Sequence, residues 1–421
     1  MKILSIIAQK PYATGSGVYF TELVRQFDDM GYEQAIVCGI AGEEDFLPYE
    51  QKFPKVKMFP VRFNSQKLSF DILGMSDVMP YPSTRYRDLD KEQVQCFEKA
   101  FVQKIREVVD QFEPDLILCH HLYLLTSIVV ENFADHRIAA ICHGTCLRQL
   151  ATNPLEKERI LSALRKIPWI FALQNVQKEE ICSFGILGER IKVLGNGYDP
   201  SVFFEEDNAE KDKESALAGI EGCCLEKPDP SEIRLAYAGK ISFSKGLMSL
   251  LGAIDRIVNK KICLYLAGGA GVADEFEKIR ERAERCRHKV VFLGLQTQPE
   301  LAKLYRCCDL FVFPSYYEGL GLAIIEAMAC GLPVVVSETE GLQEWVRSKL
   351  DDPPVEFVPL PSMQSIDRPI DSELPLYEQR LAEAIERQIE RDLQGRKIDM
   401  SAFSWERVAE GILAHCRMGN F

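Results

Sequence analysis

The sequence predicts an α/β protein of two domains, each built on a parallel, doubly wound sheet. Three observations indicate this. The chain has 421 residues, more than one hydrophobic core usually supports. Short apolar runs alternate with amphipathic segments along both halves, as strands and helices do in such sheets. The stretch 208–232 between the halves is rich in charged residues, proline and glycine, so we expect a surface insertion at the domain boundary.

The first half begins with a short buried strand and continues with helices and strands in alternation. Because parallel strands need helical crossovers, this order favours a parallel sheet. The expected strands are Ile3–Ile7, Gln34–Gly39, Asp115–His120, Ile138–His143, Trp169–Leu173 and Ile191–Leu194, and the expected helices are Gly15–Phe27 and Val94–Phe112.

The second half restarts the same pattern, and two helices close the chain. We expect residues 1–198 to form one domain, 199–233 a linker, 234–402 a second domain, and 403–421 a helix that returns to the first. The carboxyl ends of both sheets would face a cleft. The expected strands are Arg234–Ala238, Cys263–Ala267, Val290–Leu293 and Leu310–Pro314. The expected helices are Gly246–Val258, Glu275–Cys286, Pro299–Cys307, Leu376–Asp392 and Trp405–Cys416, with a proline-rich loop at Pro353–Pro369.

The composition of the chain disfavours several classes of protein. The net charge is −13, which disfavours nucleic-acid binding and broad docking on an anionic membrane. No apolar stretch reaches the length of a membrane span. The 14 cysteines show no repeated zinc-ligand spacing, and most lie in apolar runs, so we expect reduced, buried thiols in a cytoplasmic protein.

Glu318 and Glu326 are the most informative residues. They stand eight positions apart, with Gly319 and Gly321 after the first. An apolar run, Leu310–Ser315, precedes them and predicts a buried strand, and the helix that follows is expected to stop at a glycine. The first carboxylate therefore falls on a strand-to-helix loop and the second inside the helix. Glycine amides at a helix start suit a phosphate or a hydroxyl group, and a carboxylate at each end suits two sets of sugar hydroxyls. A chance pair on a surface helix is the alternative.

Further candidates also lie at strand ends. Lys240 and Lys245 flank a loop after a strand, where two cations five residues apart can bracket a diphosphate; a solvated loop is the alternative. Gly15–Gly17 follows the first strand, but it is too short for a dinucleotide fingerprint. His143 precedes Gly144 at another strand end, where its imidazole suits a sugar hydroxyl. Neighbouring His121 would support it, and the glycine-rich loop at Gly268 lets a ligand approach the backbone.

Taken together, these motifs resemble family 4 of the retaining glycosyltransferases, which have the two-domain GT-B fold. The E-x7-E element, Glu318 and Glu326, is the most specific part of the resemblance. The loop from Gly239 to Gly246 resembles the family's G-R-x-x-x-x-K-G motif, with Lys240 in place of the usual arginine. That exchange keeps the charge and loses bidentate phosphate geometry.

The resemblance implies a donor site for a nucleotide-diphosphate sugar. Glu318 would hold hexose hydroxyls, Glu326 the ribose, and the two lysines the diphosphate, helped by the Gly17 amide. The base would lie near 292–295. The implied catalytic residues are His143, Lys240, Lys245 and Glu318, and the implied donor-binding residues are Gly15, Ser16, Gly17, Lys240, Lys245, Gly268, Leu295, Glu318, Gly319, Leu320, Gly321 and Glu326.

The implied activity is transfer of a hexosyl unit from a nucleotide sugar, with UDP-sugars preferred, to a hydroxyl acceptor without a metal ion or other cofactor. The acceptor side is expected in the first half, at His121, Arg85 and Arg87. A soluble acceptor or a glycan end is favoured over a membrane lipid. Two alternatives remain open. A sugar-nucleotide epimerase of the same fold would interconvert UDP-sugars without an acceptor, and a non-catalytic nucleotide-sugar-binding protein would show no turnover.

Overall fold

The computed structural model describes residues 1–77, 79–206, 231–318, 320–365, 367–391 and 398–418. The chain forms two compact units, Met1–Asn196 with Trp405–Phe421, and Gly197–Ser404. The insertion expected at 208–232 lies almost wholly outside the described residues, as do Cys223 and Cys224. No described cysteine forms a disulfide, and most are buried.

The first unit is built on a parallel sheet. Among the described residues it has seven strands in the order β3-β2-β1-β6-β7-β8-β9, and every adjacent pair is parallel. The predicted doubly wound sheet is therefore confirmed. The strands are β1 (Lys2–Ile7), β2 (Glu33–Ile40), β3 (Lys57–Arg62), β6 (Leu116–His120), β7 (Ile138–Ile141), β8 (Trp169–Ala172) and β9 (Ile191–Val193), with a small pair β4 (Leu73–Gly74) and β5 (Thr84–Arg85).

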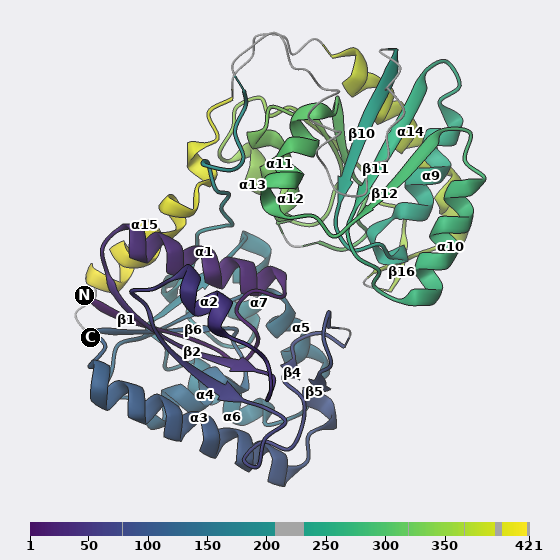
Figure 1. Ribbon diagram of the computed structural model, residues 1–421. Helices are drawn as coiled ribbons and strands as arrows, with labels where there is room; N and C mark the ends of the chain where they lie inside the picture. The colour runs from purple at the N-terminus through teal and green to yellow at the C-terminus, as the bar shows by residue number, and fades with distance from the viewer. Residues whose placement is uncertain (78, 207–230, 319, 366, 392–397, 419–421) are drawn as a thin grey trace. The chain divides into compact units, whose positions relative to one another are not determined.

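Helices cover both faces of this sheet. The helices are α1 (Gly15–Asp29), α2 (Leu47–Lys52), α3 (Lys91–Phe112), α4 (Leu124–Asn132), α5 (Thr145–Thr152), α6 (Lys157–Leu164), α7 (Asn175–Ser183) and α15 (Trp405–Met418), with short 3-10 turns at Tyr86–Asp88 and Gly188–Arg190. Helices α1 and α15 pack together on one face, and α3, α4 and α6 lie on the other (Figure 1). Asp90 caps α3 with a full capping box, which fixes the start of this helix.

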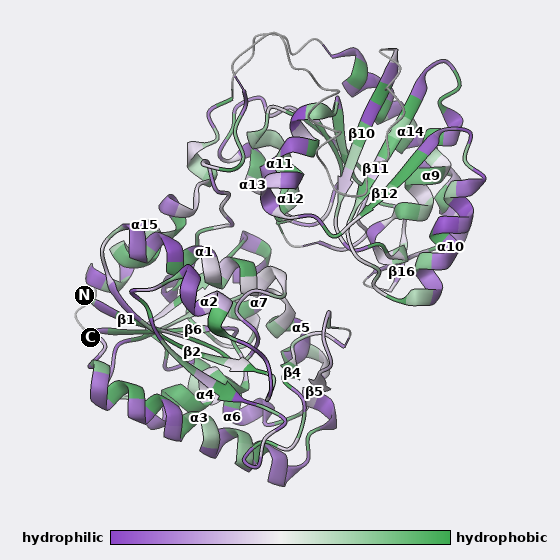
Figure 2. Ribbon diagram, in the orientation of Figure 1, coloured by the Kyte–Doolittle hydropathy of each residue, from purple (hydrophilic) through white to green (hydrophobic). Residues whose placement is uncertain are grey.

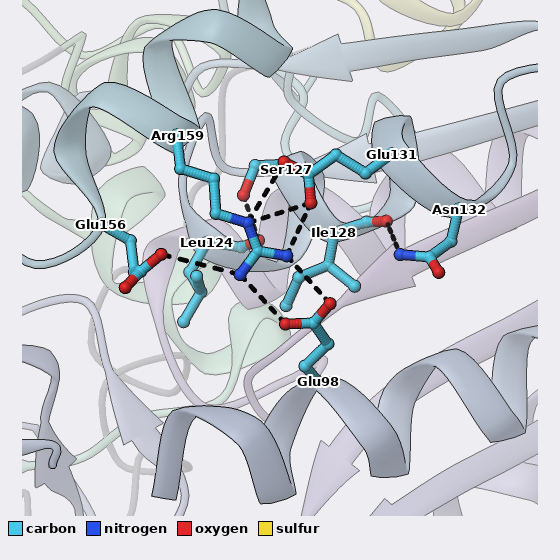
Figure 3. A network of polar contacts seen from close by, with 8 residues as sticks. All are labelled: Glu98, Leu124, Ser127, Ile128, Glu131, Asn132, Glu156 and Arg159. Carbon is cyan, nitrogen blue, oxygen red and sulfur yellow. Dashed lines mark hydrogen bonds and ion pairs between the residues drawn. The ribbon is translucent and has the colours of Figure 1, made fainter. Parts of the chain in front are cut away.

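A single guanidinium ties the helices of the second face together. Arg159 on α6 lies 2.9 Å from a carboxylate oxygen of Glu98 on α3 and 2.6 Å from one of Glu131 on α4 (Figure 3). Glu156 approaches it at 3.7 Å. Because Arg159 meets both main partners through two nitrogens each, it fixes the spacing of three helices.

The second unit repeats the design. Its main sheet, of six strands within the described part of the chain, has the order β12-β11-β10-β13-β14-β15 and is parallel throughout. The strands are β10 (Glu232–Ala238), β11 (Lys261–Ala267), β12 (Lys289–Gly294), β13 (Leu310–Phe313), β14 (Val334–Ser337) and β15 (Val355–Val358), and a small antiparallel pair is formed by β16 (Met363–Ser365) and β17 (Arg368–Pro369).

Helices again lie on both faces. They are α9 (Leu247–Arg256), α10 (Ala273–Glu284), α11 (Gln298–Cys307), α12 (Leu322–Ala329), α13 (Leu342–Arg347) and α14 (Leu374–Glu390), with 3-10 turns at Phe243–Lys245, Asp371–Glu373 and Ser401–Phe403. Figure 2 shows the hydrophobic residues concentrated on the central strands, whereas α10 is largely hydrophilic. The expectation of a plain loop at Pro353–Pro369 is wrong, because the valines of β15 pair with β14 between the prolines.

Candidate functional site

The carboxyl edge of the second sheet is held together by its own backbone. The Gly239 amide donates to the Ala267 carbonyl at 2.9 Å, and the Gly268 amide donates to the Gly294 carbonyl at 2.7 Å. The loops that leave β10, β11 and β12 are thus joined directly. Peptide groups fixed in this way keep their positions when a ligand arrives, which favours a preformed site.

Two glycines let these loops approach closely. Gly268 has φ +152°, and a Cβ there would lie 1.7 Å from the Gly239 carbonyl oxygen. Gly246 has φ +69°, and its Cβ would lie 1.9 Å from the Pro314 carbonyl oxygen. No side chain fits at either distance. Gly268 therefore has a structural function in the edge, and its predicted contact with a donor stays a prediction.

Lys245 and Glu318 meet at this edge. Lys245 ends the 3-10 turn Phe243–Lys245 after β10, and Glu318 lies on the loop after β13. The Lys245 Nζ donates to Glu318 Oε2 at 2.5 Å, and each side chain keeps 22% of its surface exposed. The Tyr316 amide donates to the Ser244 carbonyl at 3.0 Å, which fixes one loop against the other. The structure therefore brings together two residues that are 73 positions apart in sequence.

Lys240 adds a second cation to this edge. Its alkyl chain crosses Gly271, where a Cβ would lie 2.6 Å from Lys240 Cδ. Partial burial lowers its pKa, and the nearby charge of Lys245 lowers it further. Lys240 forms no ion pair with any described residue. Two neighbouring ammonium groups, one of them without an ion-pair partner, favour binding of an anion with several oxygens.

Helix α12 begins and ends as the sequence predicts. Gly321, with φ +53°, is its N-cap residue, and Gly331, with φ +76°, follows its end. Glu318 accordingly lies before the helix. Glu326 lies within it and is 7% exposed. Burial raises the pKa of the Tyr305 phenol, and the nearby charge of Glu326 raises it further. Gly319 lies outside the described residues.

The predicted base-binding region contains one prominent side chain. Leu295 follows β12 and is 83% exposed, and a Cβ at neighbouring Gly269 would lie 3.2 Å from it. An exposed leucine beside bare backbone is suited to cover the flat face of a base. Leu320, in contrast, is 1% exposed and belongs to the core, so only its backbone is available to a ligand.

The glycine loop of the first unit starts α1. Thr14 caps this helix by accepting a hydrogen bond from the Gly17 amide at 3.1 Å, and the Ser16 hydroxyl lies 3.0 Å from the Thr14 hydroxyl. The Gly17 amide thus already has an acceptor, which leaves the predicted diphosphate contact without support from this geometry. Gly15 has open space around its Cα.

Three histidines gather at the ends of β6 and β7. The Nδ1 atom of His120 lies 3.0 Å from Nε2 of His143, and the ring of His121 lies 4.7 Å from that of His143. Tyr19 packs edge-on against His143 with 5.1 Å between ring centres. Burial, followed by the neighbouring histidines, holds the pKa of His143 well below its usual value, so the ring is neutral at pH 7. His121 is 4% exposed, which favours a supporting position.

The two arginines predicted for the acceptor side have partners of their own. Arg85 Nε donates to Asp88 at 2.6 Å, and Arg87 is bonded to both carboxylate oxygens of Asp77. Their contact with an acceptor stays a prediction.

The sequence analysis did not single out Lys10, Tyr12 and Glu44, which meet at the ends of β1 and β2. The Lys10 Nζ donates to Glu44 Oε1 at 2.9 Å, and the Tyr12 hydroxyl donates to the same oxygen at 2.5 Å. Lys10 and Tyr12 follow the first strand directly, and that position was the one signal available.

No group of three or more His, Cys, Asp or Glu side chains in the described part of the chain is arranged to hold a metal ion. No helix within the described ranges is long and apolar enough to cross a membrane.

Comparison with known families gives a match in each unit. Residues 13–202 match the model described as Glycosyltransferase Family 4, and residues 232–357 match the one described as Glycosyl transferases group 1. The chain belongs to this family of glycosyltransferases.

Individual relatives match the chain at low identity or over only part of its length. An uncharacterized glycosyltransferase of Methanocaldococcus jannaschii is 33% identical over 43% of this chain and 45% of its own length. The N-acetyl-alpha-D-glucosaminyl L-malate synthase of Bacillus anthracis is 24% identical over 82% of both chains. The matched stretch covers about half the length of the first two curated relatives, at 45% and 47%. The structure of Anabaena HepE with UDP and glucose superposes with a TM-score of 0.63 over 98% of both chains at 16% identity, which confirms the GT-B fold.

Proposed function

We propose that this chain transfers a hexosyl unit from a nucleotide-diphosphate sugar, preferably a UDP-sugar, to a hydroxyl acceptor, with retention of anomeric configuration and without a metal ion. The contact between Lys245 and Glu318, with Lys240 beside it, carries the proposal. It places two cations that suit a diphosphate beside a carboxylate that suits sugar hydroxyls, and all three lie on one edge of the sheet.

The resident ion pair prepares the site for its ligand. Glu318 holds Lys245 in place while the site is empty. A diphosphate then offers Lys245 a stronger partner, and the freed Glu318 oxygens accept hydrogen bonds from hexose hydroxyls. Glu326, buried in α12, is the proposed ribose ligand, and neutral His143 is the proposed partner of a sugar hydroxyl.

The proposed reaction balances without further groups. The bond between the anomeric carbon and the diphosphate oxygen breaks, and the acceptor oxygen bonds to the same face of that carbon. The acceptor proton passes to the departing diphosphate. The two lysines stabilise the charge that develops on the leaving group. UDP is favoured as the nucleotide because a protein of the same fold was crystallised with UDP and glucose.

A thermal-shift screen with nucleotides and nucleotide sugars tests the donor side. We expect UDP or a UDP-sugar to raise the unfolding temperature, and we expect slow release of UDP from the matching sugar. Lys245→Ala and Glu318→Ala should each lose at least tenfold in donor affinity. Lys278→Ala and Glu277→Ala are matched controls, because both side chains are exposed in ion pairs on α10.

The outcomes separate the proposal from its alternatives. Interconversion of UDP-sugars without an acceptor would indicate an epimerase. Stabilisation by UDP with no turnover over a broad acceptor panel would indicate a binding protein. No response to any nucleotide would overturn the proposal. An initial NMR spectrum of the product tests retention, and equal rates with EDTA and with added Mg²⁺ test metal independence.

A further inference from the structure

A polar and aromatic cluster occupies the carboxyl ends of β1 and β2 in the first unit. We call it the Tyr12 cluster, and its members are Gln9, Lys10, Tyr12, Glu44 and Tyr81. They come from three separate stretches of sequence. The Lys10 Nζ lies 2.8 Å from Glu44 Oε2 and 4.9 Å from the centre of the Tyr81 ring. Tyr12 packs against Tyr49, with 5.4 Å between ring centres.

Glu44 is fully engaged in holding the cluster. One oxygen accepts from Lys10 at 2.9 Å and from Tyr12 at 2.5 Å, and the other accepts from the Ala41 amide at 3.0 Å. Burial alone would raise the pKa of Glu44, but these hydrogen bonds outweigh it and the pKa is lowered. The carboxylate is therefore ionised, and three hydrogen bonds occupy it. Its function is to position Lys10 and Tyr12.

The groups that it positions remain available. Tyr12 is 37% exposed, one of the few large hydrophobic side chains of this unit at the surface. An ammonium has three N–H donors, and the structure gives Lys10 one hydrogen bond to Glu44, with the second Glu44 oxygen 2.8 Å away. Gln9 is 1% exposed, and its Oε1 accepts from the Ser16 hydroxyl at 3.3 Å, so it offers no donor to a ligand at the surface.

The charges of the cluster cancel. Glu44 neutralises Lys10, and the nearby Arg62 guanidinium donates to the backbone carbonyls of residues 41, 42 and 44. An anionic ligand would need a cation free of partners. A flat exposed ring with a hydrogen-bond donor beside it instead fits a neutral ring that carries hydroxyls.

We propose that the Tyr12 cluster is an acceptor subsite for a neutral sugar ring. The ring stacks on Tyr12, and one of its hydroxyls accepts a hydrogen bond from the Lys10 ammonium. This assignment rests on the proposed transferase activity, and it places acceptor recognition at Tyr12 instead of at the paired Arg85 and Arg87.

Saturation-transfer NMR on the full chain tests binding without any donor. The probes are methyl α-glucoside, methyl α-mannoside and methyl α-galactoside, each paired with the corresponding hexose 6-phosphate. We expect at least one methyl glycoside to bind the wild type. Tyr12→Ala should raise its apparent Kd at least tenfold, whereas Tyr12→Phe, which keeps the ring, should stay within about threefold. Tyr32→Ala, at the amino end of β2, should leave binding unchanged.

Kinetics distinguish positioning from folding. Glu44→Gln should raise the acceptor KM with little change in kcat, and Lys10→Met should do the same. Both should leave UDP release without acceptor at the wild-type rate. The subsite is overturned if Tyr12→Ala binds glycosides as the wild type does, if only the phosphates bind, or if no probe binds. UDP stabilisation and UDP release do not use the Tyr12 cluster in the proposed mechanism, so their loss would instead count against the proposed function.

Discussion

A double-mutant cycle on Lys245 and Glu318 measures the exchange of partners proposed for the donor edge. The variants are Lys245→Met, Glu318→Gln and the pair together. At 2.5 Å, two unit charges attract by about 7 kcal/mol at an effective dielectric constant of 20 and by about 1.7 kcal/mol in water. Desolvation and the ordering of two side chains consume most of that attraction, and partial exposure adds screening. We expect a coupling free energy of about 1–2 kcal/mol in the empty protein.

The decisive measurement repeats the cycle with saturating UDP. If a diphosphate takes over Lys245, the coupling should fall below about 0.5 kcal/mol, because Glu318 then no longer faces its partner. Unfolding in denaturant, followed by tryptophan fluorescence, gives the free energies. Trp345 reports on the second unit, since it is buried there. The coupling should also weaken in 0.5 M NaCl when UDP is absent.

An unchanged coupling in the presence of UDP would refute the exchange. The diphosphate would then bind without displacing Glu318, and Lys240 would have to supply the main contact. A coupling near zero in the empty protein would refute the ion pair itself. The pair Lys278 and Asp274, exposed on α10, is the matched control and should couple weakly in both conditions.

Three further predictions concern stability. Gly246→Ala should lower the stability of the second unit by about 2–4 kcal/mol in denaturant unfolding, because alanine would adopt a left-handed backbone conformation and its Cβ would clash with the Pro314 carbonyl. The variant should also bind UDP more weakly, and unchanged stability would contradict the packing. Arg159→Met should cost about 1–3 kcal/mol in denaturant unfolding, because it leaves partly buried carboxylates facing each other; a cost indistinguishable from zero would exclude this cause. Burial lowers the pKa of His120 and His143, so the unfolded chain binds more protons, and stability should fall by up to about 1.4 kcal/mol for each histidine from pH 7.5 to 5.5; a variant with glutamine at both positions should show a smaller fall in calorimetry.

Much of the fold can be predicted from local sequence patterns, and where the prediction fails the cause is also local. Buried parallel strands are continuous apolar runs, and each one predicted for the main sheets is present. Helix α4 gives no amphipathic signal because seven of its nine residues are buried, so its sequence lacks a polar face. Strand β15 was missed since the prolines around it dominate the local signal.

The candidate site can likewise be predicted from the sequence only in part. Residues on strand-end loops, such as Glu318 and Lys245, are found because position along the chain predicts the edge that they occupy. Which side chains bond to each other depends on long-range packing. The contact of Lys10 with Glu44 spans 34 residues, and no local pattern announces it. The ion pairs of Arg85 and Arg87 are also properties of the folded chain.

The interlocked loops after β10, β11, β12 and β13 set limits on redesign. A side chain at Gly268 or Gly246 would push one loop away from the next, so libraries that randomise these positions should yield mostly destabilised protein. Leu295 stands on the same edge with 83% of its surface exposed, and substitutions there leave the backbone joints intact. A substitution at Leu295 should therefore cost little stability, and comparing nucleotide binding by Leu295→Ala and the wild type would test the predicted contact with the base.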